Sequence, residues 1–208
     1  LRLLSAEDEC NALAIDALKN AATQNGRAVD VVRQFRDQLR NGQSNRQAVD
    51  VHRLIATAAE AAEPEAHRCG FAIGSDVDAR LGPVHADAAH IEHVILNLLR
   101  NAIEAMQGAA IVRGSIRLRA RPGRPGFVQL SIIDDGPGLD AAVGENLFEP
   151  FHTTKENGLG LGLSVSRAVV EAHGGELWWD ADRTTGAAFH FTLPLSPDGA
   201  GISREVSE

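Results

Sequence analysis

The 208-residue chain has no tyrosine, one methionine, only two cysteines and no long apolar run. Cys10 and Cys69 are too few and too far apart for a disulfide framework or a metal-binding spacing, so we expect a reducing, cytoplasmic setting. No apolar stretch approaches the ~20 residues of a membrane helix, so we expect no membrane contact. The net charge of −8 argues against nucleic-acid binding, because phosphates would be repelled.

What is present is typical of a globular protein, with 44% hydrophobic and 23% charged residues. Because the chain opens at Leu1 rather than Met, we expect it to be part of a longer protein. Apolar residues recur with a 3-4 spacing over 11–41, which predicts an amphipathic helix that needs a partner. The pattern leaves open whether residues 1–41 form a hairpin packed on a domain or half of an intermolecular bundle. Residues 42–48 are expected to be a linker.

From residue 49 onward, strand and helix patterns alternate. This alternation predicts an α+β domain over 49–196, with three helices against one sheet, and a polar tail over 197–208. Helices are expected at 52–69, with an interruption at Pro64, at 86–106 and at 161–173. Strands are expected at 71–77, 115–119, 128–133, 176–179 and 187–193, the second and third of these forming a hairpin.

The helix predicted over 86–106 carries two amides in an otherwise apolar pattern. Asn97 and Asn101 are four residues apart and therefore share one face, which Arg100 borders. The carbonyl oxygen of Asn101 could bind Mg²⁺, a hard ion that would in turn hold phosphate oxygens. Alternatively, both asparagines brace or cap loops, because buried amides need partners.

A second motif follows the strand predicted over 128–133. Asp134 ends an apolar run, so we expect its carboxylate to be partly buried and to need a donor, such as the amino group of adenine. Gly136 and Gly138 would let the backbone approach a flat ring. The alternative is a plain turn, since Asp-Gly and Pro-Gly are turn dipeptides.

A third motif lies in the stretch 147–155. Its two aromatic residues, Phe148 and Phe151, suggest a lid held by apolar contacts, and Thr154 and Lys155 could face phosphates. Alternatively, the phenylalanines are core anchors and Lys155 is solvated.

The fourth motif opens the helix predicted over 161–173. Alternating glycines at a helix N-terminus expose backbone N–H groups to an anion, and the helix dipole adds to the attraction. The motif consists of Gly158, Leu159, Gly160, Leu161 and Gly162.

In order and spacing, the four motifs together resemble the ATP-binding catalytic domain of bacterial sensor histidine kinases, which has the Bergerat fold of gyrase, Hsp90 and MutL. The asparagine helix resembles the N box of that family, and the stretches 134–138, 148–155 and 158–162 resemble its G1, F and G2 boxes. Within this family, the motifs most resemble those of the nitrogen-regulation and nitrogen-fixation sensor kinases. The resemblance covers about residues 49–195 and implies a two-layer α/β sandwich.

The resemblance also implies roles. ATP and Mg²⁺ would be the cofactors, with Asn101 as the metal ligand and Asp134 bonded to adenine. The helix over 11–41 resembles the second helix of the dimerisation hairpin, so a homodimer is expected, and a response regulator would be the partner. The ATP-binding residues would be Asn97, Arg100, Asn101, Asp134, Gly136, Gly138, Phe151, Thr154, Lys155, Gly158, Leu159, Gly160, Leu161 and Gly162.

Two differences from the family pattern bear on mechanism. Relatives that hydrolyse ATP have a glutamate base where this chain has Asn97, and an amide cannot take a proton from water. None of the eight histidines lies in the His-Glu-x-x-x-Pro setting of the phosphoacceptor. We therefore expect the chain to bind nucleotide without phosphorylating itself, the γ-phosphoryl passing to a histidine outside it. The alternatives are a Bergerat-fold ATPase and a nucleotide-binding pseudokinase or docking module.

Overall fold

The computed structural model describes residues 45–139, 144, 146–150, 152, 160–181, 183 and 185–197. The helices in this part of the chain are α2 (Val51–Arg68), α3 (Ala88–Gly108) and α5 (Gly162–Ala172). The strands are β1 (Gln47–Val49), β2 (Phe71–Val77), β3 (Val84–Ala86), β4 (Gly114–Pro122), β5 (Phe127–Asp134), β6 (Leu177–Trp179) and β7 (Ala188–Pro194). The helix predicted over 11–41 lies outside the described residues, as does all but the first residue of the predicted tail.

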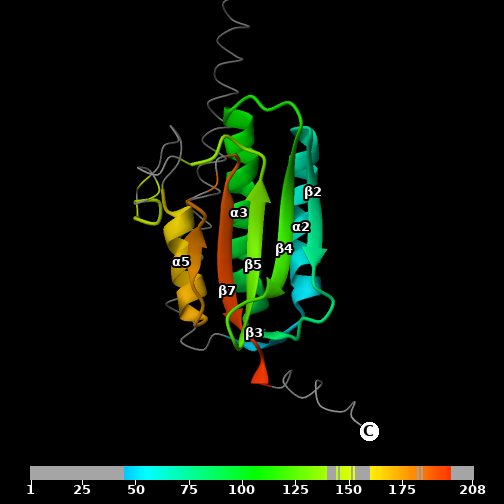
Figure 1. Ribbon diagram of the computed structural model, residues 1–208, viewed down its shortest axis with the longest axis vertical. Coiled ribbons are helices and arrows are strands. Elements are labelled where there is room, and N and C mark those ends of the chain that lie inside the picture. The colour runs from blue at the N-terminus through cyan, green and yellow to red at the C-terminus, as the bar shows by residue number, and fades with distance from the viewer. Residues whose placement is uncertain are drawn as a thin grey trace, which may run out of the picture. The chain divides into compact units, whose positions relative to one another are not determined.

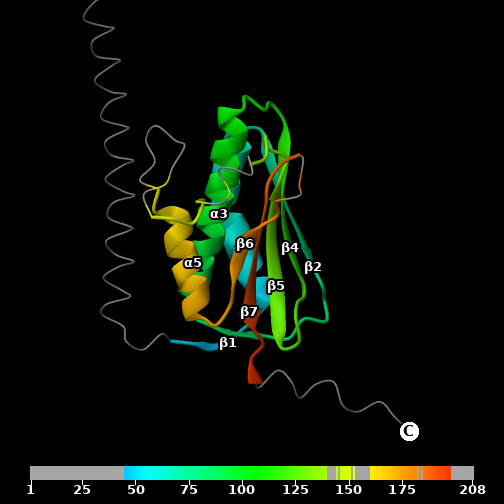
Figure 2. The same ribbon diagram turned by 60° about the vertical axis from the view of Figure 1, so that its left-hand side comes forward.

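Five strands form one mixed sheet, in the order β2-β4-β5-β7-β6. β2 and β4 are parallel, and the other neighbouring pairs are antiparallel. The three helices cover one face of this sheet, and α3 packs between α2 and α5 (Figures 1 and 2). The predicted α+β class and two-layer arrangement are confirmed. No helix in the described ranges has the length and apolar character needed to cross a bilayer.

The two layers follow from apolar periodicity. On β4, Ile116, Leu118 and Ala120 are buried, whereas the alternate residues Arg117 and Arg119 lie on the other face. The broad apolar face predicted for the central helix is confirmed, since every member is at most 4% exposed: Ile91, Val94, Ile95, Leu98, Leu99, Ala102 and Ile103. Burial of this face on both neighbouring helices and the sheet makes α3 the centre of the core.

The prediction that Pro64 interrupts the first helix is wrong. α2 runs without a break from Val51 to Arg68 with Pro64 inside it. Pro64 and Glu60, one turn earlier, are both exposed, so water can satisfy the carbonyl group that the proline leaves without a donor.

A small sheet of β1 and β3 was not predicted. These two short strands pair antiparallel, with Ala48 opposite His85. Gln47 and Ala48 belong to the stretch expected as linker and are part of β1. Three residues carry too little periodicity to identify a strand from sequence.

Beside this small sheet, His173 joins the end of α5 to the start of α3. Its Nδ1 lies 2.7 Å from the Val169 carbonyl oxygen, which can only accept, and its Nε2 lies 3.2 Å from the Asp87 amide, which can only donate. His173 is therefore neutral, with its proton on Nδ1. Burial lowers the pKa of His173, and the nearby charge of Arg46, which donates to the Ala172 carbonyl, lowers it further.

This geometry makes the free energy of unfolding depend on pH. Because the folded state lowers the pKa of His173 below its ordinary value of 6.5, the unfolded chain takes up the proton first. We expect full stability above pH 6.5 and decreasing stability as the pH falls below it. His190 contributes in the same direction, since burial lowers its pKa too. Urea unfolding at a series of pH values measures the decrease.

The variant His173→Gln, which cannot titrate, should flatten part of that decrease. His52→Gln is the control, because the side chain of His52 is exposed on α2. The same pH dependence in His173→Gln as in the parent chain would contradict the assignment.

Candidate functional site

The motifs predicted from sequence meet at one edge of the sheet. The carboxyl end of β5, the N-terminal end of α5 and the second half of α3 lie together there (Figure 1). The loop between β6 and β7 closes the same edge, since the Asp134 amide donates to the Ala187 carbonyl oxygen at 3.0 Å. The candidate site is therefore built from four separate segments of the chain.

Asp134 is the most buried acidic group of this edge, at 2% exposure, as the apolar run before it predicts. Its Oδ1 accepts two backbone hydrogen bonds, from Gly136 at 2.8 Å and from Ala187 at 3.1 Å. Desolvation raises the pKa of Asp134, and the two backbone donors oppose that rise. Among the described residues both hydrogen bonds go to Oδ1, which leaves Oδ2 able to accept from a ligand.

Glycines shape the backbone around this carboxylate. A Cβ on Gly136 would lie 2.6 Å from Asp134 Oδ1, so a side chain there would break the first hydrogen bond. Gly138 has φ +85° and faces the Gly186 carbonyl oxygen. Gly186 has φ +67°, and a Cβ there would overlap the Asp134 carbonyl oxygen. The sequence predicts that Gly136 and Gly138 make room for a ligand. The structure shows a further reason for glycine at both positions, which is close contact with other parts of the protein.

Asn97 reaches across from α3 to α5. Its Nδ2 donates to Ser166 Oγ at 3.0 Å. Its Oδ1 lies so close to Gly162 that a Cβ on that glycine would be only 2.6 Å away. Asn97 therefore has the bracing role that the sequence left open. Asn101 lies one turn further along α3 and is half-buried. No group of three or more His, Cys, Asp or Glu side chains in the described residues could hold a metal ion.

Arg100 faces the other neighbour of α3. Its Nε lies 3.8 Å from Glu65 Oε2 on α2, and its side chain is 54% exposed. The structure thus turns Arg100 toward α2, whereas Asn97 turns toward α5.

The N-terminal end of α5 offers backbone donors. Leu161 occupies the cap position, and no described side chain caps the helix. Gly160, just before it, has φ +65°. The amides in the first turn, which starts at Gly162, have no partner within the helix, as at any helix N-terminus. An anion is the ligand that such an end favours.

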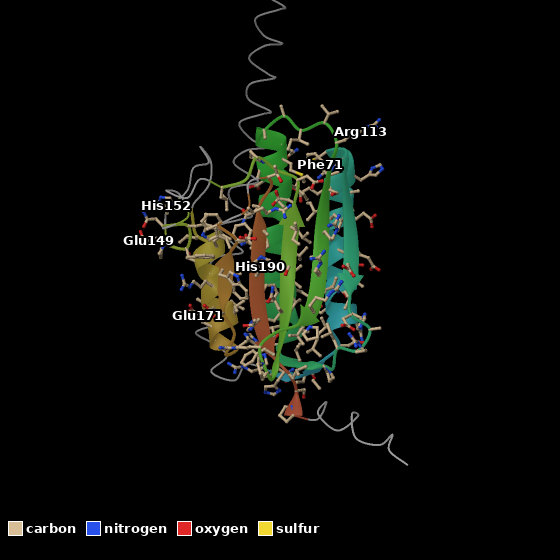
Figure 3. The ribbon with its side chains drawn as sticks, viewed as in Figure 1. Phe71, Arg113, Glu149, His152, Glu171 and His190 are labelled. Atoms are coloured by element: carbon tan, nitrogen blue, oxygen red, sulfur yellow. The ribbon has the colours of Figure 1, made fainter. Side chains whose placement is uncertain are left out.

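The loop before α5 is described in part. Phe148 is half-buried and packs against the core, with the Arg167 guanidinium 5.1 Å from its ring centre. Phe148 is therefore a core anchor. Figure 3 shows Glu149 and His152 on the same loop. Five predicted ligand residues lie outside the described residues: Phe151, Thr154, Lys155, Gly158 and Leu159.

Comparison with known proteins identifies the family. Residues 86–197 match the family described as "Histidine kinase-, DNA gyrase B-, and HSP90-like ATPase". The chain belongs to this family. The matched range contains α3, the Asp134 turn and α5, so the family's defining part is the candidate site and its supports.

Relatives of this ATPase family include sensor kinases. The chain is 34% identical to the sensor protein FixL of Bradyrhizobium diazoefficiens over 198 residues, which is 95% of this chain and 39% of FixL. The resemblance to sensor histidine kinases is confirmed. The chain spans well under two thirds of the curated relatives it matches.

Solved structures of histidine kinases have a similar fold. The catalytic domain of histidine kinase ThkA is 30% identical with a TM-score of 0.64, over 74% of this chain and 99% of that domain. Full-length ShkA in complex with AMPPNP is 28% identical with a TM-score of 0.65, over 74% of this chain and 32% of ShkA. ThkA is also known in complex with response regulator protein TrrA, at 25% identity and a TM-score of 0.63, over 84% of this chain and 50% of that chain.

Three residues of the site were not predicted. Ser166 holds Asn97, the Ala187 amide holds Asp134, and Gly186 lets the loop pass over Asp134. The sequence predicts a strand over 187–193, but this signal does not show that the backbone before it supports Asp134. Ser166 carries no sequence signal, since a serine in a helix is ordinary.

Gly186→Ala tests the support of Asp134. The left-handed backbone alone should cost about 1–2 kcal/mol, and the overlap with the Asp134 carbonyl should cost more. We expect a lower free energy of unfolding in urea. Gly174→Ala is the matched control, because Gly174 also has a left-handed backbone, with φ +78°, and nothing lies within 4 Å of a Cβ there. Equal stability of the two variants would contradict the tight approach.

Proposed function

We propose that residues 45–197 bind ATP with Mg²⁺ and form the catalytic part of a sensor protein-histidine kinase. In the whole protein, the γ-phosphoryl of ATP would pass to a histidine outside the described residues and then to a response regulator. The helix expected over 11–41 would pair two copies into a homodimer. Membership of the ATPase family and the sensor-kinase relatives support this proposal. The binding of AMPPNP by ShkA and of TrrA by ThkA supports the nucleotide and the partner.

The observation that carries the proposal is the buried carboxylate of Asp134. Two backbone N–H groups hold Oδ1, so the orientation of Oδ2 is set by the protein before any ligand arrives. A preorganised acceptor in a desolvated setting favours a ligand that donates, and the N6 amino group of adenine is such a donor. Guanine has a carbonyl oxygen at the same position, so we expect it to bind much more weakly.

The phosphates would lie toward α5. The first-turn amides of α5 attract negative charge, and Asn101 on the neighbouring helix supplies one hard oxygen donor. A single protein oxygen fits Mg²⁺, which usually keeps several waters and takes further oxygens from substrate phosphates. Bound there, the metal would neutralise the charge that develops during phosphoryl transfer. The described residues bind and orient the nucleotide.

Asn97 favours transfer over hydrolysis. Its amide donates to Ser166 and cannot accept a proton from water, so a water molecule would not be activated from this position. The phosphoryl group would then wait for a nucleophile from elsewhere in the whole protein.

Asp134→Asn tests the adenine contact. Asparagine can keep Oδ1 and its two backbone donors, but it places an NH₂ group where the ligand needs an acceptor. We expect ATP affinity to fall by about tenfold or more, because a hydrogen bond to a charged group is lost and two donors face each other. Titration calorimetry with Mg²⁺ and ATP measures the fall. Unchanged affinity would contradict the adenine role.

Asn101→Ala tests the metal contact. We expect the variant to bind ATP with the same affinity whether or not Mg²⁺ is present, whereas Mg²⁺ should tighten ATP binding in the parent chain. Arg100→Ala is the neighbouring control, since Arg100 pairs with α2, and it should keep the Mg²⁺ effect. A Mg²⁺ effect of full size in Asn101→Ala would contradict the assignment.

A further inference from the structure

Beside the buried valines that face α3, α5 carries a serine that makes a polar contact with α3. Ser166 is 3% exposed, in a helix whose other buried residues are Val169 and Val170. Its hydroxyl accepts from Asn97 Nδ2 at 3.0 Å. A buried polar pair gives direction to an interface that apolar side chains alone would leave free to slide.

The same asparagine touches the glycine-bearing start of α5. A Cβ at residue 162 would lie 2.6 Å from its Oδ1, so a side chain there would have to displace the Asn97 amide. Asn97 therefore contacts α5 at two points one turn apart, Gly162 and Ser166. Two contacts fix both the distance and the rotation of the first turn of α5 relative to α3.

We propose that Asn97, Gly162 and Ser166 form a strut that sets where the first-turn amides of α5 stand relative to Asn101, and that Ser166 is a positioning residue for the phosphates of ATP. This rests on the proposed function. Asn97 and Asn101 lie one turn apart on one rigid helix, so an α5 that is fixed to Asn97 is also fixed relative to the proposed metal ligand.

The strut is separate from the adenine end. Asp134 is held by backbone groups of Gly136 and Ala187, and neither belongs to α3 or α5. Loss of the strut should therefore weaken the binding of phosphates and leave the binding of the adenosine part intact. A general loss of structure would weaken both.

The experiment measures the binding of AMPPNP with Mg²⁺ and of adenosine to the whole chain, each by NMR titration, for the parent chain and for Ser166→Ala. We expect Ser166→Ala to lose about three- to tenfold in AMPPNP affinity, the range for one hydrogen bond, and to keep its adenosine affinity. Ser131→Ala is the matched control. Ser131 is similarly buried, at 4%, and its hydroxyl lies 2.8 Å from Nδ1 of His190, on the face of the sheet away from the helices.

The cycle of Asn97→Ala, Ser166→Ala and the double variant adds a second measure. If the two side chains act together, the double variant should lose less AMPPNP affinity than the product of the single losses. Equal loss of AMPPNP and adenosine in Ser166→Ala would overturn the strut and leave an ordinary structural serine. Full retention of both ligands would overturn it as well. A parent chain that binds adenosine but gains nothing from phosphates and Mg²⁺ would overturn the strut and the phosphate part of the proposed function together, whereas a parent chain that binds neither ligand would overturn the proposed function itself.

Discussion

The desolvated carboxylate of Asp134 is the constraint on which the rest of the site depends. A buried carboxylate is costly unless donors hold it, and here both donors are backbone amides. One comes from the turn after β5 and the other from the residue before β7, so the ends of two neighbouring strands must stay in register. The antiparallel pairing of Ile133 with Ala188 supplies that register. A sheet that serves as scaffold thus fixes a single acceptor at its edge.

The central helix α3 relates this acceptor to the other end of the proposed ligand. Its apolar face is buried on the sheet, so its position relative to Asp134 is set by the core. On the side that faces α5, Asn97 extends from α3 to the first turns of α5. Arg100 is turned toward α2 instead. One helix therefore holds the two halves of the site at a fixed separation.

Much of the fold could be predicted from sequence, because strong periodicity decided it. The apolar face of α3 has a long, regular pattern and is confirmed, and the short strand predicted from Phe71 to Val77 is confirmed as well. Pro64 was misjudged because a local rule about proline ignores whether the freed carbonyl is exposed to water. The strands β1 and β3 were missed because three residues hold no usable period. They exist through their pairing with each other, which only the folded chain reveals.

The candidate site was predictable only in part, for the same physical reason. Asp134 follows an apolar run, and this local signal predicted its burial correctly. The partners that make it useful, the amide of Ala187 and the serine at 166 beside Asn97, come from distant segments and act through backbone geometry or an ordinary side chain. Sequence patterns indicate residue types, whereas these contacts depend on which distant segments the fold brings together.

The proposed function depends most on a hydrogen bond from the amino group of adenine to Asp134. Competition between ATP and inosine triphosphate tests it most directly, because the two nucleotides share ribose and phosphates and inosine carries a carbonyl oxygen in place of that amino group. We expect ATP to bind at least about tenfold more tightly, since inosine would leave a buried carboxylate facing an oxygen. Equal affinity for the two nucleotides would contradict it.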